Sequence, residues 1–341
     1  MATYRAIEAL DGAFQQVERE LSAPGAGQVR IRVEACGVCH SDVLGVHNLN
    51  GSRPAGTPVV PGHEVVGWID AVGTGVANWT VGQRAGVGFL AGHCGVCESC
   101  RRGDFVFCTD QPVTGDTIDG GYAEYLTAPA SGLVAVPDEW DAAEAAPLLC
   151  AGITVFNGLR KGAAGPGGLV AVQGIGGLGH LAIQYAAKLG LRVVAIARGV
   201  DKRELALKLG ATDYIDSSAV DPGKALQELG GAQVIVATAA SGASMSPLVE
   251  GLGLRGKLIV LGAAADPIEV GTGALIFGGR SIEGSLTGTP SENEANLAFA
   301  LARDVRPMVE RVPLEQAAEA YARMMSGAAR FRMVLTTGAA R

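Results

Sequence analysis

Short apolar runs alternate with helix-like stretches through the second half of this 341-residue chain. The run from Leu169 to Gln173 precedes a helical stretch at Gly177 to Leu189, and the run from Arg192 to Ala197 precedes another at Asp201 to Leu209. Strands that alternate with helices predict a parallel sheet covered by helices on both faces. Two further apolar runs continue the alternation, at Val234 to Ala237 and Lys257 to Leu261.

A glycine-rich turn joins the first of these strands to its helix. Its spacing is G-x-G-x-x-G: the first glycine allows a tight turn, the second lets backbone approach a pyrophosphate, and the third lets helix and strand pack closely. The helix N-terminus offers unpaired N–H groups and a partial positive charge to the phosphates. The alternative is a glycine-rich turn that binds no ligand. The predicted dinucleotide site comprises Gly174, Gly176, Gly177, Leu178 and Gly179.

The end of the next strand bears on which dinucleotide binds. An acidic residue there would accept the ribose hydroxyls of NAD, but this chain has Arg198, with Lys202 beyond it. An arginine pairs with the 2′-phosphate that a carboxylate would repel. We therefore predict that NADP is favoured over NAD. If Arg198 merely faces solvent, either cofactor can bind.

The two ends of the chain have a different pattern of predicted secondary structure. Strand-like segments in the first third are separated by glycine and proline, which predicts a small β-rich domain such as a partly open barrel. These segments are Tyr4 to Ala9, Gln28 to Ala35, Val65 to Val72 and Gly121 to Thr127. Near the C-terminus, a strand at Phe331 to Leu335 is expected after one amphipathic helix. The core face of that helix is predicted to hold Leu314, Ala317, Ala318, Tyr321, Met324 and Met325.

Charge and composition exclude several classes of partner. The formal net charge is −7 with no Lys/Arg cluster, which argues against nucleic acid. We expect no secretory signal and no apolar run long enough to span a bilayer, so a cytoplasmic protein with reduced thiols is predicted. The seven cysteines are an odd, clustered set, for which metal binding is a better explanation than disulfides.

Four cysteines have the spacing C-x2-C-x2-C-x7-C, and thiolates this close in sequence can surround one tetrahedral ion. A closed four-cysteine site is typical of structural zinc. The rival is an iron–sulfur cluster, whose ferredoxin-type run has a tighter last spacing and a following proline. The predicted ligands are Cys94, Cys97, Cys100 and Cys108.

The remaining cysteines are Cys36, Cys39 and Cys150. Cys36 and Cys39 follow an alternating strand and form a C-x-x-C pair, which is compatible with redox chemistry, a metal site or neither. A catalytic zinc needs about three protein ligands and one open position. Cys39, His63 and Cys150 would supply two thiolates and an imidazole, a set suited to a metal that binds an alkoxide or carbonyl oxygen. Spacing alone does not show that the three converge.

Several motifs occur in the same order as in the zinc-dependent medium-chain alcohol dehydrogenases, and the chain resembles this family. Its sequence pattern is most similar to the bacterial and cinnamyl-alcohol-dehydrogenase-like members. The motifs are Cys39-His40-Ser41-Asp42, Gly62-His63-Glu64, the four-cysteine lobe, Cys150 to Thr154, and Gly174 to Gly179. The resemblance implies a GroES-like β-barrel over residues 1–147, with a zinc lobe at 93–109. It also implies a Rossmann domain at 148–287, a segment at 288–341 that completes the catalytic domain, and an active site in the cleft.

The resemblance assigns roles around the catalytic zinc. Cys39, His63 and Cys150 resemble its ligands, and Glu64 resembles the nearby acid that can approach the metal. Asp42 resembles the carboxylate that orients His63. Cys36 is then left over, and we predict that it is a buried small residue at the end of its strand.

The resemblance also assigns roles around the cofactor and substrate. Ser41 resembles the hydroxyl that takes the substrate proton, and His40 a residue near the cofactor pyrophosphate. Thr154 resembles the residue behind the nicotinamide, Arg332 a C-terminal phosphate contact, and Phe89 a wall of the substrate pocket.

One position departs from the family pattern. Many relatives carry a histidine five residues beyond the first ligand cysteine, which passes the proton to solvent, but this chain has Leu44. Proton release through Ser41 would then end on the ribose hydroxyls or water, and nothing in the sequence shows that His47 substitutes. Leu44, Phe89 and Trp68 suggest apolar surroundings for the substrate.

The implied activity interconverts alcohols and aldehydes or ketones by hydride transfer to or from NAD(P), with zinc as the Lewis acid. The implied assembly is a homodimer or homotetramer. A polyol or sugar dehydrogenase is an alternative, although such relatives often have glutamate where this chain has Cys150. A non-catalytic cofactor-binding protein is a further alternative, and it would need only one zinc per chain.

Overall fold

The computed structural model describes residues 2–339. The backbone divides into two compact units. The first contains the chain as far as Cys150, together with Gly288–Leu301 and the segment from Pro307 onward. The second contains Ala151–Thr287 and Ala302–Arg306.

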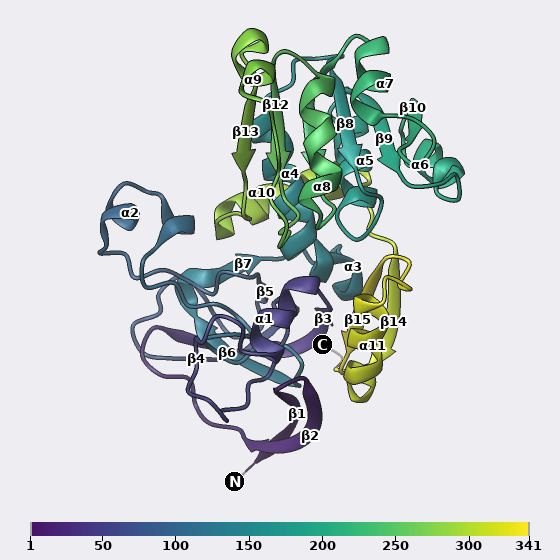
Figure 1. Ribbon diagram of the computed structural model, residues 1–341. Helices are drawn as coiled ribbons and strands as arrows, with labels where there is room; N and C mark the ends of the chain where they lie inside the picture. The colour runs from purple at the N-terminus through teal and green to yellow at the C-terminus, as the bar shows by residue number, and fades with distance from the viewer. Residues whose placement is uncertain (1, 340–341) are drawn as a thin grey trace. The chain divides into compact units, whose positions relative to one another are not determined.

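The second unit is built on a fully parallel sheet, as predicted (Figure 1). Within the described residues, its six strands lie in the order β10-β9-β8-β11-β12-β13. If the strands are numbered along the chain, this is the doubly wound order 3-2-1-4-5-6. The second and third strands extend the sheet to one side of β8, and the last three extend it to the other side. The bounds are β8 (Leu169–Gln173), β9 (Arg192–Ala197), β10 (Asp213–Asp216), β11 (Ala232–Ala237), β12 (Leu252–Val260) and β13 (Ser281–Gly284).

Helices connect these strands. Right-handed crossovers to either side of β8 place the connecting helices on opposite faces of the sheet. Every residue of β8 is buried, as expected of a strand covered on both faces. The helices are α4 (Ile153–Gly162), α5 (Gly179–Lys188), α6 (Arg203–Lys208), α7 (Pro222–Glu228), α8 (Gly242–Met245), η5 (Ser246–Gly251) and α9 (Thr272–Gly278).

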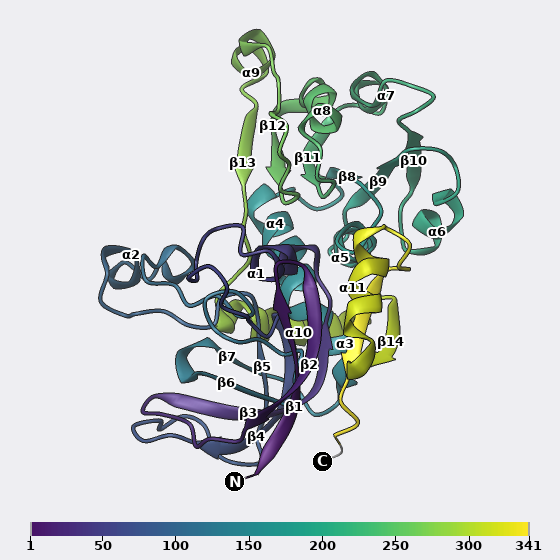
Figure 2. The same ribbon diagram turned by 60° about the horizontal axis from the view of Figure 1, so that its bottom comes forward.

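The first unit holds the predicted β-rich domain. Among the described residues, its main sheet has the order β14-β15-β3-β4-β5-β7, and β6 also pairs with β3. A separate hairpin, β1–β2, is visible in Figure 2. The bounds are β1 (Thr3–Leu10), β2 (Ala13–Glu20), β3 (Gln28–Gly37), β4 (Glu64–Val72), β5 (Arg84–Val87), β6 (Tyr125–Pro129), β7 (Leu133–Ala135), β14 (Val309–Pro313) and β15 (Arg332–Thr336).

The C-terminal strand completes this sheet. β15 pairs antiparallel with β3, and Leu335 lies opposite Cys36. The alternating burial of β3 confirms the predicted half-buried strand. The strand expected at Gly121 to Thr127 begins only at Tyr125, and the polar strand β2 was not predicted.

Short helices connect or cap these strands. Those in the first third of the chain are a single turn each, which is why the sequence shows no helical period there. They are η1 (His40–Asp42), α1 (Val43–Val46), α2 (Glu98–Arg101), η2 (Phe105–Phe107), η3 (Ala130–Gly132), α3 (Ala142–Pro147), η4 (Leu148–Gly152), α10 (Pro290–Arg303), η6 (Leu314–Gln316) and α11 (Ala317–Met325).

The predicted core face of the C-terminal helix needs correction. Ala318 and Met325 are exposed, while Ala320 is buried with Leu314 and Ala317, because a 3₁₀ turn precedes α11 and shifts the buried face.

The expectation that no segment is long enough to span a bilayer also needs correction. The continuous helical segment Ala142–Gly162 is long and apolar enough to cross a membrane by length and composition alone. Its most apolar window is 78% buried within the protein, as in the core helix of a folded domain.

Candidate active site and metal centres

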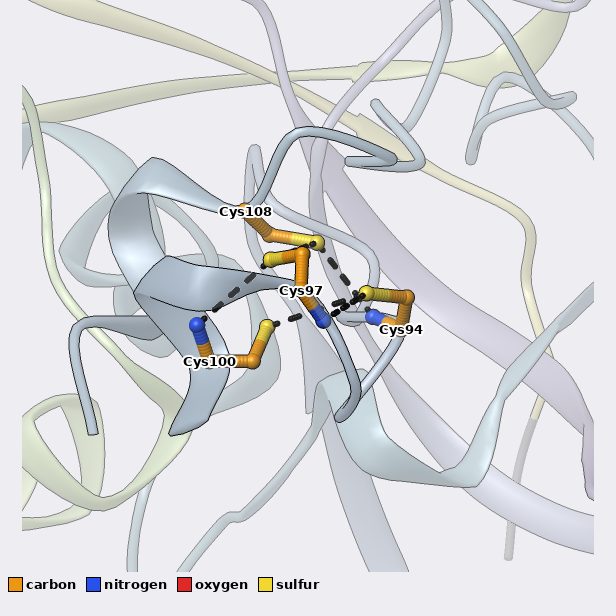
Figure 3. A group of neighbouring side chains, drawn as sticks. All are labelled: Cys94, Cys97, Cys100 and Cys108. Atoms are coloured by element: carbon orange, nitrogen blue, oxygen red, sulfur yellow. Dashed lines mark hydrogen bonds between the residues drawn. The ribbon is translucent and has the colours of Figure 1, made fainter. Parts of the chain in front are cut away.

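The four cysteines of the lobe converge on one point (Figure 3). The sulfur of Cys94 lies 4.0 Å from that of Cys100, and the sulfur of Cys97 lies 4.0 Å from that of Cys108. Tetrahedral zinc with Zn–S bonds of about 2.3 Å separates its sulfurs by about 3.8 Å. A disulfide would need about 2.05 Å. The arrangement therefore fits one tetrahedral ion and no disulfide.

The lobe has almost no core of its own. Of residues 93–109, all of them described, only Cys100 and Cys108 are buried. Backbone N–H groups of Cys100 and Thr109 donate to the sulfur of Cys97 and lower its pKa to about 5. The backbone thus favours the thiolate form that a metal requires.

A second group of potential ligands lies in the first unit. It comprises Cys39, His63, Glu64 and Cys150, whose ligand atoms all lie within 4.8 Å of one another. The sulfurs of Cys39 and Cys150 are 3.9 Å apart, again close to the edge of a zinc tetrahedron. The fold therefore brings together residues whose convergence the sequence spacing left open.

The electrostatics of this centre favour a bound cation. His63 Nδ1 lies 2.7 Å from Asp42 Oδ1, while the buried Nε2 has no hydrogen-bond partner within residues 2–339. Burial alone would lower the pKa of His63, but the Asp42 carboxylate and the Cys39 sulfur raise it well above its usual value. A hydrogen bond from Cys150 holds the pKa of the Cys39 thiol well below its usual range. An orphaned imidazole nitrogen beside a thiolate is a suitable zinc site.

Asp42 is held by more than His63. Its Oδ2 accepts a hydrogen bond from the Cys39 N–H at 2.9 Å and another from the Tyr122 hydroxyl at 2.9 Å. Burial raises the pKa of Tyr122 well above its usual value, so this hydroxyl stays protonated and donates. Tyr122 was not predicted as a site residue, because nothing near it in the sequence links it to Asp42, which lies 80 positions earlier.

Glu64 forms a buried ion pair with Arg332, a residue of the C-terminal strand. Burial raises the pKa of Glu64 to about 7, against the lowering effect of the Arg332 charge. Gly37 leaves the space for this carboxylate, since a Cβ there would lie 1.9 Å from Glu64 Oε2. Arg332 therefore lies beside the metal-binding group, whereas the family resemblance implied a phosphate contact.

Cys150 lies in a wide π-helical turn, η4. Two buried asparagines of α10 support this turn: Asn293 Nδ2 donates to the Leu149 carbonyl at 3.1 Å, and Asn296 Nδ2 donates to the Leu148 carbonyl at 3.0 Å. π-turns commonly occur at functional sites. Neither asparagine was predicted, because the segment that they support lies 144 and 148 positions away in the sequence.

The other predicted residues of this site differ in their exposure and in their contacts. Phe89 packs edge-on against the His63 ring, with centroids 5.2 Å apart. Ser41 and Leu44 are half-buried in η1 and α1, and His40 is exposed. The exposed His47 packs on Gly12, where a Cβ would lie 2.6 Å from His47 Cε1.

Two further residues lie within the sheet of the first unit. Trp68 packs under the Arg84 guanidinium, 5.4 Å from the ring centroid. Cys36 is buried at the end of β3, as predicted, and belongs to neither group of potential ligands found among residues 2–339. The C-x-x-C pair is therefore not one metal-binding unit.

The glycine-rich turn lies at the carboxyl end of β8, beside the point where the strand order reverses. Gly174 has φ +87°, and a Cβ on Gly179 would lie 1.8 Å from the Gly174 carbonyl oxygen. A Cβ on Gly176 would meet nothing within 4 Å among the described residues, so the backbone there is open to a ligand. This geometry fits a dinucleotide pyrophosphate.

Three further residues predicted to bind the cofactor lie in the second unit. Lys202 Nζ donates to the Ile175 carbonyl at 2.8 Å, and the exposed Arg198 directly follows β9. Thr154, on α4, donates its hydroxyl to the Leu286 carbonyl at 3.2 Å.

Comparison with known proteins agrees with this arrangement. The family described as "Alcohol dehydrogenase GroES-like domain" matches residues 25–138, and "Zinc-binding dehydrogenase" matches residues 177–302. The chain is 47% identical over 319 residues to alcohol dehydrogenase patD of Penicillium expansum, covering 94% of this chain and 93% of that protein.

Solved structures give the same result. A cinnamyl alcohol dehydrogenase from Sorghum bicolor superposes with a TM-score of 0.89 at 32% identity, covering 100% of this chain and 99% of that one. The protein CAD from Helicobacter pylori, complexed with NADP(H), superposes with a TM-score of 0.85 at 26% identity, covering 100% of this chain and 99% of that one.

The chain belongs to the zinc-dependent medium-chain alcohol dehydrogenase family. Its fold combines a GroES-like domain with a Rossmann domain. It is an NAD(P)-dependent zinc enzyme that interconverts alcohols and aldehydes.

Proposed function

We propose that Cys39, His63 and Cys150 hold the catalytic zinc and that Glu64 is the acid able to approach it. The observation that carries this assignment is the buried Nε2 of His63, which lacks a hydrogen-bond partner in the described chain and lies among two sulfurs. The lobe cysteines would hold a second, structural zinc. The first unit, whose first segment ends at Cys150 and not at residue 147, would form the catalytic domain around both metals, and the second unit the cofactor domain.

Zinc bound at this centre supplies a Lewis acid that acidifies an alcohol and polarises a carbonyl. The nicotinamide supplies the hydride acceptor or donor. Ser41 accepts the alcohol proton, and Asp42 keeps the His63 ring oriented through Nδ1. Because Leu44 cannot carry a proton, the next proton acceptor after Ser41 would be water or a ribose hydroxyl of the bound cofactor. Phe89 and Leu44 would supply apolar walls for the substrate.

Replacement of one ligand tests the zinc assignment. Cys39→Ser should abolish turnover, lower the zinc content from two ions per chain to one, and leave cofactor binding intact. Zinc is measured by native mass spectrometry, and cofactor binding by quenching of protein fluorescence. Turnover that survives, or two zinc ions retained by the variant, would overturn the assignment. A panel of aliphatic and aromatic alcohols and aldehydes then defines the substrate class.

We propose that NADP is preferred because Arg198 follows β9 where NAD enzymes carry an acidic residue. The Arg198 side chain is exposed, and its guanidinium can pair with a 2′-phosphate. The ratio of kcat/KM for NADPH and NADH is the measurement. Arg198→Ala should lower this ratio about tenfold or more, in line with the 1.5–3 kcal/mol of a charged hydrogen bond. A wild-type preference for NADH would contradict the proposal.

We propose that the enzyme is a homodimer or homotetramer and acts in the cytoplasm. Leu254, Ile276 and Phe277 are 82%, 73% and 89% exposed near the β13 edge of the parallel sheet, which supports self-association. All seven cysteines are free, which suits a reducing compartment. Sedimentation velocity of the wild type and of Phe277→Asp tests the assembly, and a monomeric wild type would contradict it.

A further inference from the structure

The Asp42 carboxylate is the hub of a buried network in the first unit. Its Oδ1 faces His63 Nδ1, and its Oδ2 accepts from two donors, the Cys39 N–H and the Tyr122 hydroxyl. Asp42 is 2% exposed and Tyr122 is fully buried. Because water does not reach this carboxylate, its orientation depends on these three contacts.

Tyr122 is itself fixed at both ends. Its N–H donates to the Pro61 carbonyl at 2.9 Å, its carbonyl accepts from the Ile7 N–H at 2.8 Å, and the Gly121 N–H donates to the Gly62 carbonyl at 2.9 Å. The ring packs on Gly62, where a Cβ would lie 2.3 Å from Tyr122 Cδ1. Tyr122 thus contacts the residue immediately before His63 with its ring and the partner of His63 with its hydroxyl.

We propose that Tyr122 is a positioning residue of the catalytic zinc centre, which holds Asp42 so that His63 presents Nε2 to the metal. The inference rests on the zinc assignment to Cys39, His63 and Cys150. It gives the centre a second supporting layer: Tyr122 orients Asp42, and Asp42 orients His63. None of these contacts belongs to the lobe zinc, so the effect of Tyr122 is specific to one metal.

Removal of the hydroxyl defines the expected effect. In Tyr122→Phe the aromatic ring still fills the space on Gly62, but Asp42 Oδ2 keeps only the Cys39 N–H as a donor. The carboxylate can then rotate, and the His63 ring is held less firmly. Loss of an outer partner of this kind lowers metal affinity or activity by about 10- to 100-fold. We expect at least about a tenfold faster loss of the catalytic zinc and a lower kcat, with the KM for cofactor unchanged.

The chain offers a matched control. Tyr321 belongs to the same unit and is 8% exposed, but its hydroxyl has no hydrogen-bond partner within residues 2–339. Tyr321→Phe therefore removes a buried hydroxyl without removing a hydrogen bond, and it should behave as the wild type. Zinc transfer to a chromogenic chelator is followed in the wild type and both variants. Cobalt substituted at the catalytic site reports its ligand geometry through the visible d–d bands.

The expected result is faster zinc loss and shifted cobalt bands in Tyr122→Phe alone, with the lobe zinc released at the wild-type rate. Tyr122→Phe should also have no further effect in an Asp42→Asn background, because it acts through Asp42. This double-mutant cycle also tests whether Tyr122→Phe acts only by destabilising the fold. If the two substitutions lower zinc retention additively, the proposal is overturned. Unchanged zinc release and unchanged cobalt bands would also overturn it. The zinc assignment itself fails separately, if Cys39→Ser retains both zinc ions.

Discussion

The two metal-binding groups of the first unit are built in opposite ways. The lobe draws its four sulfurs from one segment, Cys94 to Cys108, and has only two buried residues, both of them ligands. The second centre draws its groups from the end of β3, the start of β4 and the π-turn η4. Asp42, His63, Glu64 and Arg332 are all buried there, beside core residues such as Val38 and Val65.

This contrast separates two uses of a metal. The ion proposed for the lobe would replace a hydrophobic core, so its binding energy would be folding energy. At the second centre the protein core already holds the side chains in place, so a bound ion would supply chemistry and little stability. The lobe should therefore depend on its metal for structure, and the second centre should keep its structure without one.

The largest expected effect comes from removing one ligand from each group. Cys100→Ser should release the lobe zinc and lower the unfolding free energy of the lobe by several kcal/mol. Cys150→Ser should keep the stability near wild type but lower turnover about a thousandfold, since Lewis-acid stabilisation is worth several kcal/mol and each 1.4 kcal/mol is tenfold. Limited proteolysis of residues 93–109 and steady-state kinetics give the two readouts. Equal proteolytic sensitivity in both variants would remove the contrast.

The next effect concerns the ion pair that only the second centre has. Arg332→Met leaves the Glu64 carboxylate buried without its partner, which should cost about 3–5 kcal/mol of stability. The double variant Glu64→Gln with Arg332→Met should recover part of that loss, because no uncompensated charge remains. Chemical denaturation measures both. If Arg332→Met is as stable as the wild type, the surrounding protein does not hold the second centre in place as the contrast with the lobe proposes.

A smaller effect is expected at the π-turn. Asn293→Leu removes the amide that donates to the Leu149 carbonyl beside Cys150, at a cost of about 1–3 kcal/mol for a buried unpaired group. It should also weaken the catalytic zinc while the lobe zinc is unaffected. Glu294→Ala is the control, because the side chain of this neighbour on α10 accepts a hydrogen bond from the Ala135 N–H. Loss of zinc from both variants alike would indicate general destabilisation of α10.

The smallest effect is expected on the surface of the lobe. Glu98 and Arg102 form an ion pair one helical turn apart, and both side chains are 69% exposed. Glu98→Gln should change stability by no more than about 0.3–0.5 kcal/mol and should not alter zinc retention. Thermal unfolding and zinc content check this. A large loss of lobe zinc would mean that surface charge, and not the thiolates alone, holds the lobe together.

The sequence predicted the four inner strands of the parallel sheet but missed its edge strands, β10 and β13. β8 and β9 have the predicted bounds, because strands buried on both faces are continuous apolar runs between glycine-rich turns. It predicted the exposed strands less well. β2 was missed because its side chains are mostly polar, and the burial of α11 was misassigned because a 3₁₀ turn changes the period.

Sequence alone determined the features that depend on neighbours along the chain: the four-cysteine lobe, the glycine-rich turn and the doubly wound half of the molecule. Tertiary structure decided what depends on distant segments. It brought Cys39, His63 and Cys150 together, left Cys36 outside, paired Glu64 with Arg332, and supported the centre with Tyr122 and Asn293. The physical reason is that a local site follows from ligand spacing, whereas side chains on separate strands and turns meet only once the core has set their positions.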